Sequence, residues 1–317
     1  MRQIKRPPRL SGYQWRILQP MERLMAARDL LLPLLSYPLP LSTDAIERAV
    51  RLARGLSQAH GPDGRFPEIP TRVTGLVYEI ELEAGLYFEG ADFGSFLDQE
   101  TRKSALNADR LTAAFEAAAT HHNVRHVCRR ERRTVDAAAR HLVDEARLHQ
   151  ATILPMRRDD INQQDLAVRL LFGSGRPMLI GPESPARQPA SAFGTVAVAW
   201  DGSRSATRAV ADAMPFLRRA AAVRIFTATD DKPAAAEARA DDLAAHLALQ
   251  GVTASVDAIR KTDAHSIGSF MESYVAAHQV DLLVMGAYGH SRLREFLLGG
   301  ATRAILMNPP CWVLLSH

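Results

Sequence analysis

The sequence predicts an α/β fold built from two tandem units, each a five-stranded parallel sheet with helices on both faces. Two observations support this prediction. Short apolar runs alternate with helical patterns along most of the chain, and continuous apolar strands between helices are typical of a parallel sheet covered on both faces. The same order of elements also occurs twice, which indicates an internal repeat. At 317 residues the chain has the length of about two domains.

The clearer copy begins at Gly194 and reads as five strands alternating with four helices. Ser203 and Asp263 are candidate N-caps, and Gly251 ends the second helix of this copy. The expected strands are GTVAVAW, AVRIFTA, VTASVDAI, DLLVMG and CWVLLSH. The expected helices are SRSATRAVADAMPFLRRA, AAAEARADDLAAHLALQG, AHSIGSFMESYVAAHQ and GATRAILM. This order is that of one doubly wound domain.

The first copy repeats the order with longer connections, mainly AHGPDGRFPEIPT and EAGLYFEGADFGSF. Its expected strands are DLLLPLLSY, RVTGLVYEI, VRHVC, ATILPM and RPMLIGP. Helices are expected from about Ser42 to Ser57, Asp98 to His122 and Thr134 to His149, with a short one before the last strand. We expect residues 29–182 and 194–317 to form the two domains, joined by a Pro/Ser/Ala-rich linker at 183–193.

Positive charge is concentrated at the N-terminus. The chain has a net charge of +4, but residues 1–28 alone carry +6, which leaves −2 for the remainder. We therefore expect no basic nucleic-acid groove on the folded body, and we expect residues 1–28 to be a flexible basic extension. Contact with an acidic surface, or a later start at Met21 or Met25, are the alternatives for this segment. The charged run CRRERR, residues 128–133, reads as a solvated turn before a helix.

The cysteines and apolar runs favour a cytoplasmic protein. Cys128 and Cys311 lie outside any CxxC motif or Cys/His cluster, so we expect reduced thiols without metal. The run LLLPLLSYPLPL resembles a signal-peptide core, but its prolines and the lack of a small-residue cleavage site favour a buried strand. No apolar stretch approaches the roughly 18 residues of a membrane span.

A glycine-rich segment follows the apolar strand DLLVM in the second copy. It reads GAYGHSRLREFLLGGAT, residues 286–302, and Gly300 opens the last helix, whose N–H groups and positive dipole end favour an anion. In a doubly wound sheet ligands bind outside the carboxyl ends of the strands, where Asp201 also lies. These glycines could instead form a tight turn, and Asp201 in DGS could only lead into the Ser203 cap. His290 lacks an acidic or nucleophilic partner, so no catalytic residue is expected.

This segment resembles the glycine loop of the universal stress protein family, which has G-x-x-G, nine residues and a third Gly between a strand and a helix. Gly286, Gly289 and Gly299 match that spacing, and Asp201 matches the acidic residue that the family places beside the ribose and metal. The resemblance covers the second copy end to end and the first copy by element order only. It implies Rossmann-like, adenine nucleotide alpha hydrolase-like domains that pair with each other, and a ligand such as ATP, AMP or ADP.

The sequence departs from the family pattern at two places. Gly300 stands where the nucleotide binders have Ser or Thr, and losing one hydroxyl bond weakens binding by about 0.5 to 1.5 kcal/mol; Thr302 is a candidate replacement. The first copy has no acid after its first strand and carries RRDDINQQ where glycines are needed, while FGSGRP is too short to substitute. We expect the first copy to pair with the second or to regulate it.

The leading prediction is a stress-response regulatory protein that binds adenine nucleotide, with or without Mg²⁺, in its second domain. Asp201 would contact ribose and be the metal ligand. The full set of predicted binding residues is Asp201, Gly286, Gly289, Arg292, Gly299, Gly300, Ala301 and Thr302. Two alternatives stay open: an interaction scaffold without nucleotide, and a slow ATPase, for which no GxxxxGK[ST] motif is present. A homodimer is a further expectation, and no membrane or nucleic-acid partner is expected.

Overall fold

The structure is a computed structural model that describes residues 29–57, 71–82, 91–184, 194–229, 233–260, 267–287 and 300–317. These residues form ten strands and eight helices. The predictions for the N-terminal extension and for the Asp263 cap lie outside the described residues.

The two halves of the chain have the same order of elements, as predicted. The first half contains β1 (Asp29–Leu35), α2 (Thr43–Ser57), β2 (Arg72–Glu81), α3 (Ala91–His121), β3 (Arg125–Thr134), α4 (Val135–Arg147), β4 (Ala151–Met156), α5 (Ile161–Ser174) and β5 (Met178–Pro182). The second half contains β6 (Thr195–Ala199), α6 (Arg204–Leu217), β7 (Ala222–Thr229), α7 (Pro233–Leu249), β8 (Ala254–Arg260), α8 (Ile267–Ala277), β9 (Leu282–Gly286), α9 (Gly300–Met307) and β10 (Trp312–Ser316).

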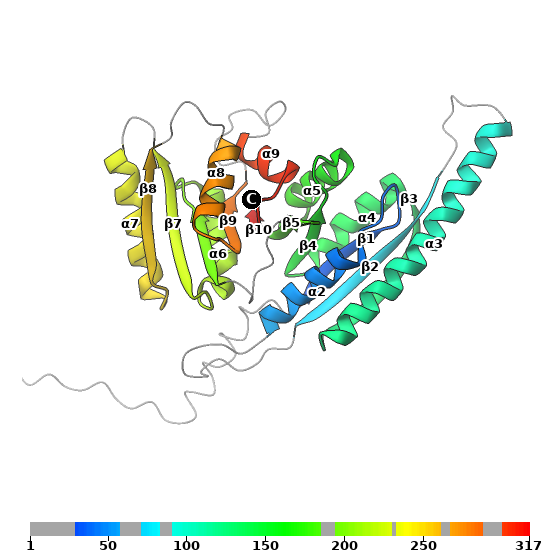
Figure 1. The fold of residues 1–317 in the computed structure, drawn as a ribbon, viewed down its shortest axis with the longest axis horizontal. Coiled ribbons are helices and arrows are strands. Elements are labelled where there is room, and N and C mark those ends of the chain that lie inside the picture. The colour runs from blue at the N-terminus through cyan, green and yellow to red at the C-terminus, as the bar shows by residue number, and fades with distance from the viewer. Residues whose placement is uncertain are drawn as a thin grey trace, which may run out of the picture.

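All ten strands belong to one sheet, in the order β3-β2-β1-β4-β5-β10-β9-β6-β7-β8 (Figure 1). Neighbours within each half are parallel, whereas β5 and β10 are antiparallel, with Val313 opposite Ile180. The predicted α/β class with two doubly wound five-stranded units is therefore confirmed. The two copies also pair with each other, as expected, and they do so through β5 and β10.

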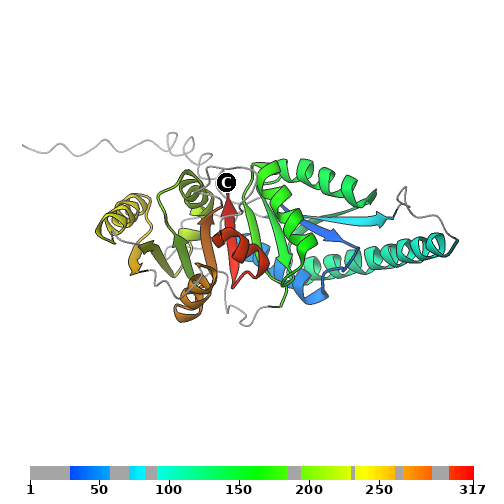
Figure 2. The same cartoon turned by 90° about the horizontal axis from the view of Figure 1, so that it is seen from above.

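Two apolar cores cover the two faces of the sheet. Along β1, Leu30, Leu32 and Leu34 point into one core and Leu31 into the other, as the twofold period of a strand requires. The first core packs against α2, α3, α6 and α7, and the second against α4, α5, α8 and α9. Figure 2 shows α3 and α4 on opposite sides of the sheet. Both cores contain residues of both halves, so the sheet is buried as one unit.

The contact between the halves is made by side chains as well as by strand pairing. A Cβ on Gly181 of β5 would lie 2.4 Å from the ring of Trp312 of β10, so only glycine leaves room for this indole. The Arg219 guanidinium donates a hydrogen bond to the carbonyl of Leu56, at the end of α2. The Asp159 N–H donates to the carbonyl of Met307 in α9 over 3.1 Å. Packing and hydrogen bonds therefore fix the second half against the first.

The predicted turn at CRRERR is wrong, because these residues lie in β3. The strand is held in the sheet by cross-strand ion pairs: Arg130 contacts Glu79 at 2.6 Å and Arg132 contacts Glu81 at 3.3 Å. Opposite charges on adjacent strands stabilise pairing without apolar side chains. The helix expected from Asp98 begins earlier, and α3 extends beyond the rest of the first half (Figure 1).

None of the described helices is both long enough and apolar enough to span a membrane.

Candidate functional site

The candidate site lies where β6 and β9 end side by side. These strands are parallel neighbours, and Ala199 pairs with Met285, so Asp201 and Gly286 lie at the same edge of the sheet. The chain leaves β6 for α6 and β9 for α9, and these helices cover opposite faces. Such a reversal of strand order is where doubly wound sheets bind ligands. The fold therefore brings the two ends of the predicted site together.

Asp201 forms the turn that leads into α6. Its Oδ1 accepts a hydrogen bond from the Ser203 N–H at 2.9 Å, and Gly202 adopts a φ of +72°. Ser203 then caps the helix, since its Oγ accepts from the Ala206 N–H at 3.1 Å. The turn interpretation of DGS is thus confirmed. Asp201 is also exposed at this edge, and its role toward ribose or a metal stays a prediction.

Gly286 lets β9 approach the first turn of α6. A Cβ there would lie 2.3 Å from the Ala206 nitrogen, 2.4 Å from the Ser205 carbonyl carbon and 2.7 Å from Ser205 Oγ. Two of these three contacts are with backbone, which cannot move aside easily. Gly286 therefore has a packing role at the site, whether or not its own backbone touches a ligand.

The start of α9 supplies the other side of the site. Gly300 is exposed, Ala301 is half-buried and Thr302 is 3% exposed. Gly300 and Ala301 are therefore the more accessible positions of this first turn. Gly289, Arg292 and Gly299 lie outside the described residues. Their predicted contacts with phosphate stay predictions.

Ala287, which follows β9 where the glycine loop begins, has contacts at both its N–H and its carbonyl. The Ala287 N–H donates to the Ser316 carbonyl at 2.8 Å, and His317 Nδ1 lies 3.1 Å from the Ala287 carbonyl. The His317 ring also packs against Phe172 of α5, with ring centroids 4.7 Å apart. The first half of the chain therefore contacts the residue that holds the base of the loop.

Arg239 is a residue at this edge that the sequence analysis missed. It lies in α7, and its Cδ is 3.9 Å from the position that a Cβ on Gly202 would take. The Arg239 side chain therefore lies next to Gly202 in the Asp201 turn. The only sequence signal was one arginine in an Ala-rich helix, which does not indicate that this helix face reaches the site.

The corresponding edge of the first half is occupied by its own charged side chains. The connection from β4 to α5 is only residues 157–160, and Arg157 Nε forms an ion pair with Glu183 Oε2 at 2.9 Å. Glu183 Oε1 also accepts the Ser42 N–H at 2.9 Å. Asp160 caps α5 by accepting from the N–H groups of Asn162 and Gln163. This agrees with the prediction that charged residues replace the glycines here.

The end of β1 is also closed. Ser36 is fully buried, its Oγ lies 2.6 Å from Ser104 Oγ of α3, and its carbonyl accepts from Asn107 Nδ2 at 3.0 Å. Thus α3 covers the position where the second half has the exposed Asp201 turn.

The family model described as "Universal stress protein family" matches residues 192–317. None of the curated proteins matches the sequence. A universal stress protein from Archaeoglobus fulgidus DSM 4304 has a similar structure, with a TM-score of 0.61 and 14% identity over 91% of this chain and 97% of that one.

A functionally unknown protein from Pseudomonas aeruginosa PAO1 is similar with a TM-score of 0.53 and 14% identity, over 92% of this chain and 93% of that one. Both similarities extend through the two halves, although at this identity they bear on fold alone. The second half of the chain thus matches the universal stress protein family model over residues 192–317, and the two halves together form one tandem α/β fold.

Proposed function

We propose that the second half binds an adenine nucleotide, ATP, ADP or AMP, and that the protein acts as a cytoplasmic stress-response regulator. The observation that supports this most is the position of the glycine loop. It leaves β9 beside the Asp201 turn at the reversal of strand order and enters α9 at Gly300. A helix start favours phosphate through its N–H groups and its dipole.

The described residues fit such a ligand. Asp201 is exposed and can accept ribose hydroxyls or coordinate Mg²⁺, while Gly300 and Ala301 can present N–H groups to phosphate. Gly289 and Gly299 would allow close approach of the loop, and Arg292 would add positive charge. Thr302 is the weakest member of the predicted set, because its buried side chain presents little surface.

Thermal unfolding with and without millimolar ATP and Mg²⁺ tests the proposal. A ligand present at a hundred times its dissociation constant stabilises the native state by about 2.7 kcal/mol. We expect a clear rise in Tm for the full chain and none for a variant combining Asp201→Ala with Gly289→Val. Gly94→Ala is the matched control, because a Cβ at Gly94 meets nothing within 4 Å.

Three results would lead to different conclusions. An equal rise in Tm for the double variant would exclude this site. No rise at any ATP concentration would favour the interaction scaffold. Phosphate release above the protein-free blank that is lost on Asp201→Ala would favour the slow ATPase.

A further inference from the structure

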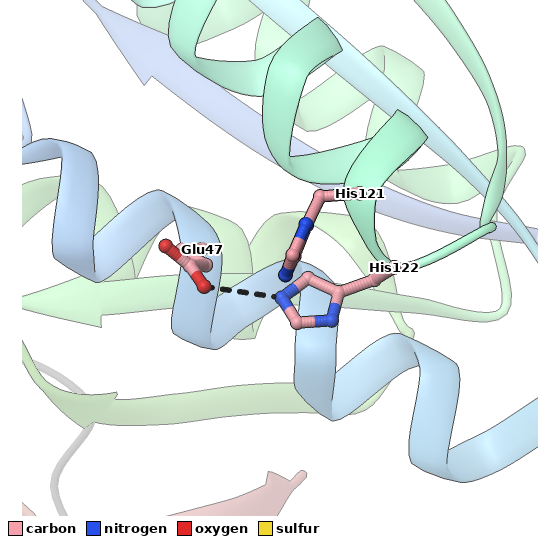
Figure 3. Close-up of side chains that lie close together, drawn as sticks. All are labelled: Glu47, His121 and His122. Atoms are coloured by element: carbon pink, nitrogen blue, oxygen red, sulfur yellow. Dashed lines mark hydrogen bonds and ion pairs between the residues drawn. The ribbon is translucent and has the colours of Figure 1, made fainter.

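Two helices of the first half bring a carboxylate and two imidazoles together, far from the glycine loop in sequence. Glu47 lies in α2, His121 is the last residue of α3, and His122 follows it. One ligand atom from each side chain lies within 4.8 Å of the others, and His122 Nε2 is 3.3 Å from Glu47 Oε1. Figure 3 shows the three side chains close together, with the His122 imidazole directed toward the Glu47 carboxylate.

The backbone that carries the two histidines is firmly fixed. The Val124 N–H donates to the Ala119 carbonyl at 2.9 Å and the Asn123 N–H to the Thr120 carbonyl at 3.0 Å, and Asn123 has a φ of 51°. This is a Schellman ending with Asn123 in the left-handed position. Ala119 and Val124 are buried in the first core, so the histidines extend from a rigid helix end.

The second half ends its equivalent helix in the same way without these side chains. In α7 the Val252 N–H donates to the Leu247 carbonyl at 3.0 Å, and Gly251 takes the left-handed position with a φ of 79°. The residues corresponding to His121 and His122 are Leu249 and Gln250. The fold therefore does not need two histidines to end this helix.

The third member of the cluster differs between the halves as well. Ser42 and Ser203 each accept a hydrogen bond at the start of α2 and α6, from Ala45 and Ala206. Counting from these serines, the position of Glu47 corresponds to Arg208 in the second half. A carboxylate and two imidazoles thus occur together in the half that lacks the glycine loop, and the other half has none of the three.

We propose that Glu47, His121 and His122 bind a divalent transition metal ion of the zinc type. Two imidazoles and one carboxylate are a ligand set that zinc accepts, with water completing the tetrahedron. Metal–ligand distances of about 2.0 to 2.2 Å place tetrahedral ligands roughly 3.3 to 3.6 Å apart. The 3.3 Å between His122 Nε2 and Glu47 Oε1 already has this value. The negative dipole end of α3 adds attraction for a cation.

A bound ion would connect α2 to the end of α3 where the chain turns into β3. The ion would have a structural role, because it would hold two helices of the first core together. The first half would then have a ligand of its own, chemically different from the nucleotide proposed for the second.

The test is a titration of ZnCl₂ into the full chain after treatment with a chelator and gel filtration, followed by calorimetry. We expect one Zn²⁺ per chain at this site. The variant combining His121→Leu with His122→Gln introduces the residues of the second half, so it should fold, and circular dichroism in the absence of zinc checks this. We expect it to lose at least about a hundredfold in affinity, and Glu47→Gln to lose at least about tenfold.

The matched control is His246→Gln, which removes an exposed histidine of α7 and should leave the titration unchanged. X-ray absorption of the zinc-loaded chain should report two imidazole ligands and lose that signature in the double variant. Unchanged zinc affinity and stoichiometry in the folded double variant would overturn the proposal. Absence of zinc binding to the unmodified chain at about 0.1 mM would overturn it too, since transition-metal sites with three ligands bind more tightly than that.

Discussion

The two halves share one topology but differ at the carboxyl edge of the sheet. At this edge β1 and β4 end in the first half, and β6 and β9 end in the second. In the second half residues 287–299 separate β9 from α9 in the chain, and Asp201 is exposed after β6, at the edge where β9 ends. In the first half residues 157–160 are the whole connection from β4 to α5. The Arg157–Glu183 pair lies there, and Glu183 is 8% exposed.

This difference separates the requirements of the fold from those of a ligand. Both halves keep the apolar strands, the covering helices and the serine caps at the start of α2 and α6. The connections at the carboxyl edge differ. A unit of this fold can therefore exchange a glycine loop for an internal ion pair while its sheet stays unchanged.

The largest effect is expected at Gly286. Gly286→Val should lower the free energy of unfolding by about 3 kcal/mol or more, because its Cβ would lie 2.3 Å from the backbone nitrogen of Ala206. Urea unfolding measures this. Gly94→Ala, which adds a Cβ in open space on α3, should not destabilise the protein. If Gly286→Val unfolds at the same urea concentration as the unmodified chain, β9 and α6 are not as closely packed as described.

The ion pair of the first half should matter next. Glu183→Ala leaves the Ser42 N–H without its acceptor and removes one acceptor of Arg157, which keeps Asp160 and the Pro40 carbonyl. Because Glu183 is largely buried, we expect the free energy of unfolding to fall by about 2 kcal/mol. The matched control is Glu81→Ala, whose partner Arg132 is 58% exposed; exposed pairs contribute about 0 to 1 kcal/mol. Equal losses of stability in the two variants would contradict the interpretation that Glu183 is a buried acceptor whose contacts stabilise this edge. Binding of ATP should be unchanged in both.

The contact between the halves should contribute less. Arg219 donates to the carbonyl at the end of α2, and burial lowers the pKa of its guanidinium. Arg219→Ala should lower the free energy of unfolding by about 1 kcal/mol, the value of one hydrogen bond. Arg218→Ala removes an exposed neighbour and should have a smaller effect. Differential scanning calorimetry compares the stability of the two variants. An equal loss of stability would mean that the Arg219 hydrogen bond does not stabilise the contact between the halves.

The elements that follow apolar patterns could be predicted from the sequence. The predicted bounds of the strand ATILPM and of the helix GATRAILM agree with β4 and α9 at both ends. Their apolar spacing and flanking residues indicate one kind of element only. The strand β3 was predicted only as far as Cys128, since its second part is charged and is held by Glu79 and Glu81 on another strand. Pairing of that kind depends on residues about fifty positions away and leaves no local pattern.

The candidate site also contains residues that could be predicted from the sequence and residues that could not. Asp201 and Gly286 could be placed because one lies just after β6 and the other ends β9, and parallel strands end at a common edge. Arg239, and the group formed by Glu47, His121 and His122, could not be predicted. These side chains meet only through the packing of one helix on another or on a turn, and helix spacing within a single segment says nothing about such contacts.

The last comparison concerns the one cysteine of each half, Cys128 and Cys311. Burial raises the pKa of the Cys128 thiol, and an electrostatic contribution of Glu116 raises it further. For Cys311 desolvation of the sulfur raises the pKa to about 12, from an ordinary value of 9.0. Because the thiolate is the form that reacts, Cys311 should be alkylated by iodoacetamide at pH 8.5 about a thousandfold more slowly in the native than in the unfolded chain.

The same shift has a consequence for stability with a defined sign. Above pH 9 the unfolded chain loses the Cys311 proton while the native state keeps it, so the free energy of unfolding falls as the pH rises from about 9 to 12. Cys311→Ser should reduce this slope, and mass spectrometry of the alkylated native chain should find Cys128 modified first. Modification of Cys311 before Cys128 would mean that the start of β10 opens more readily than the edge strand β3. The junction between the halves would then be the less stable part of the sheet.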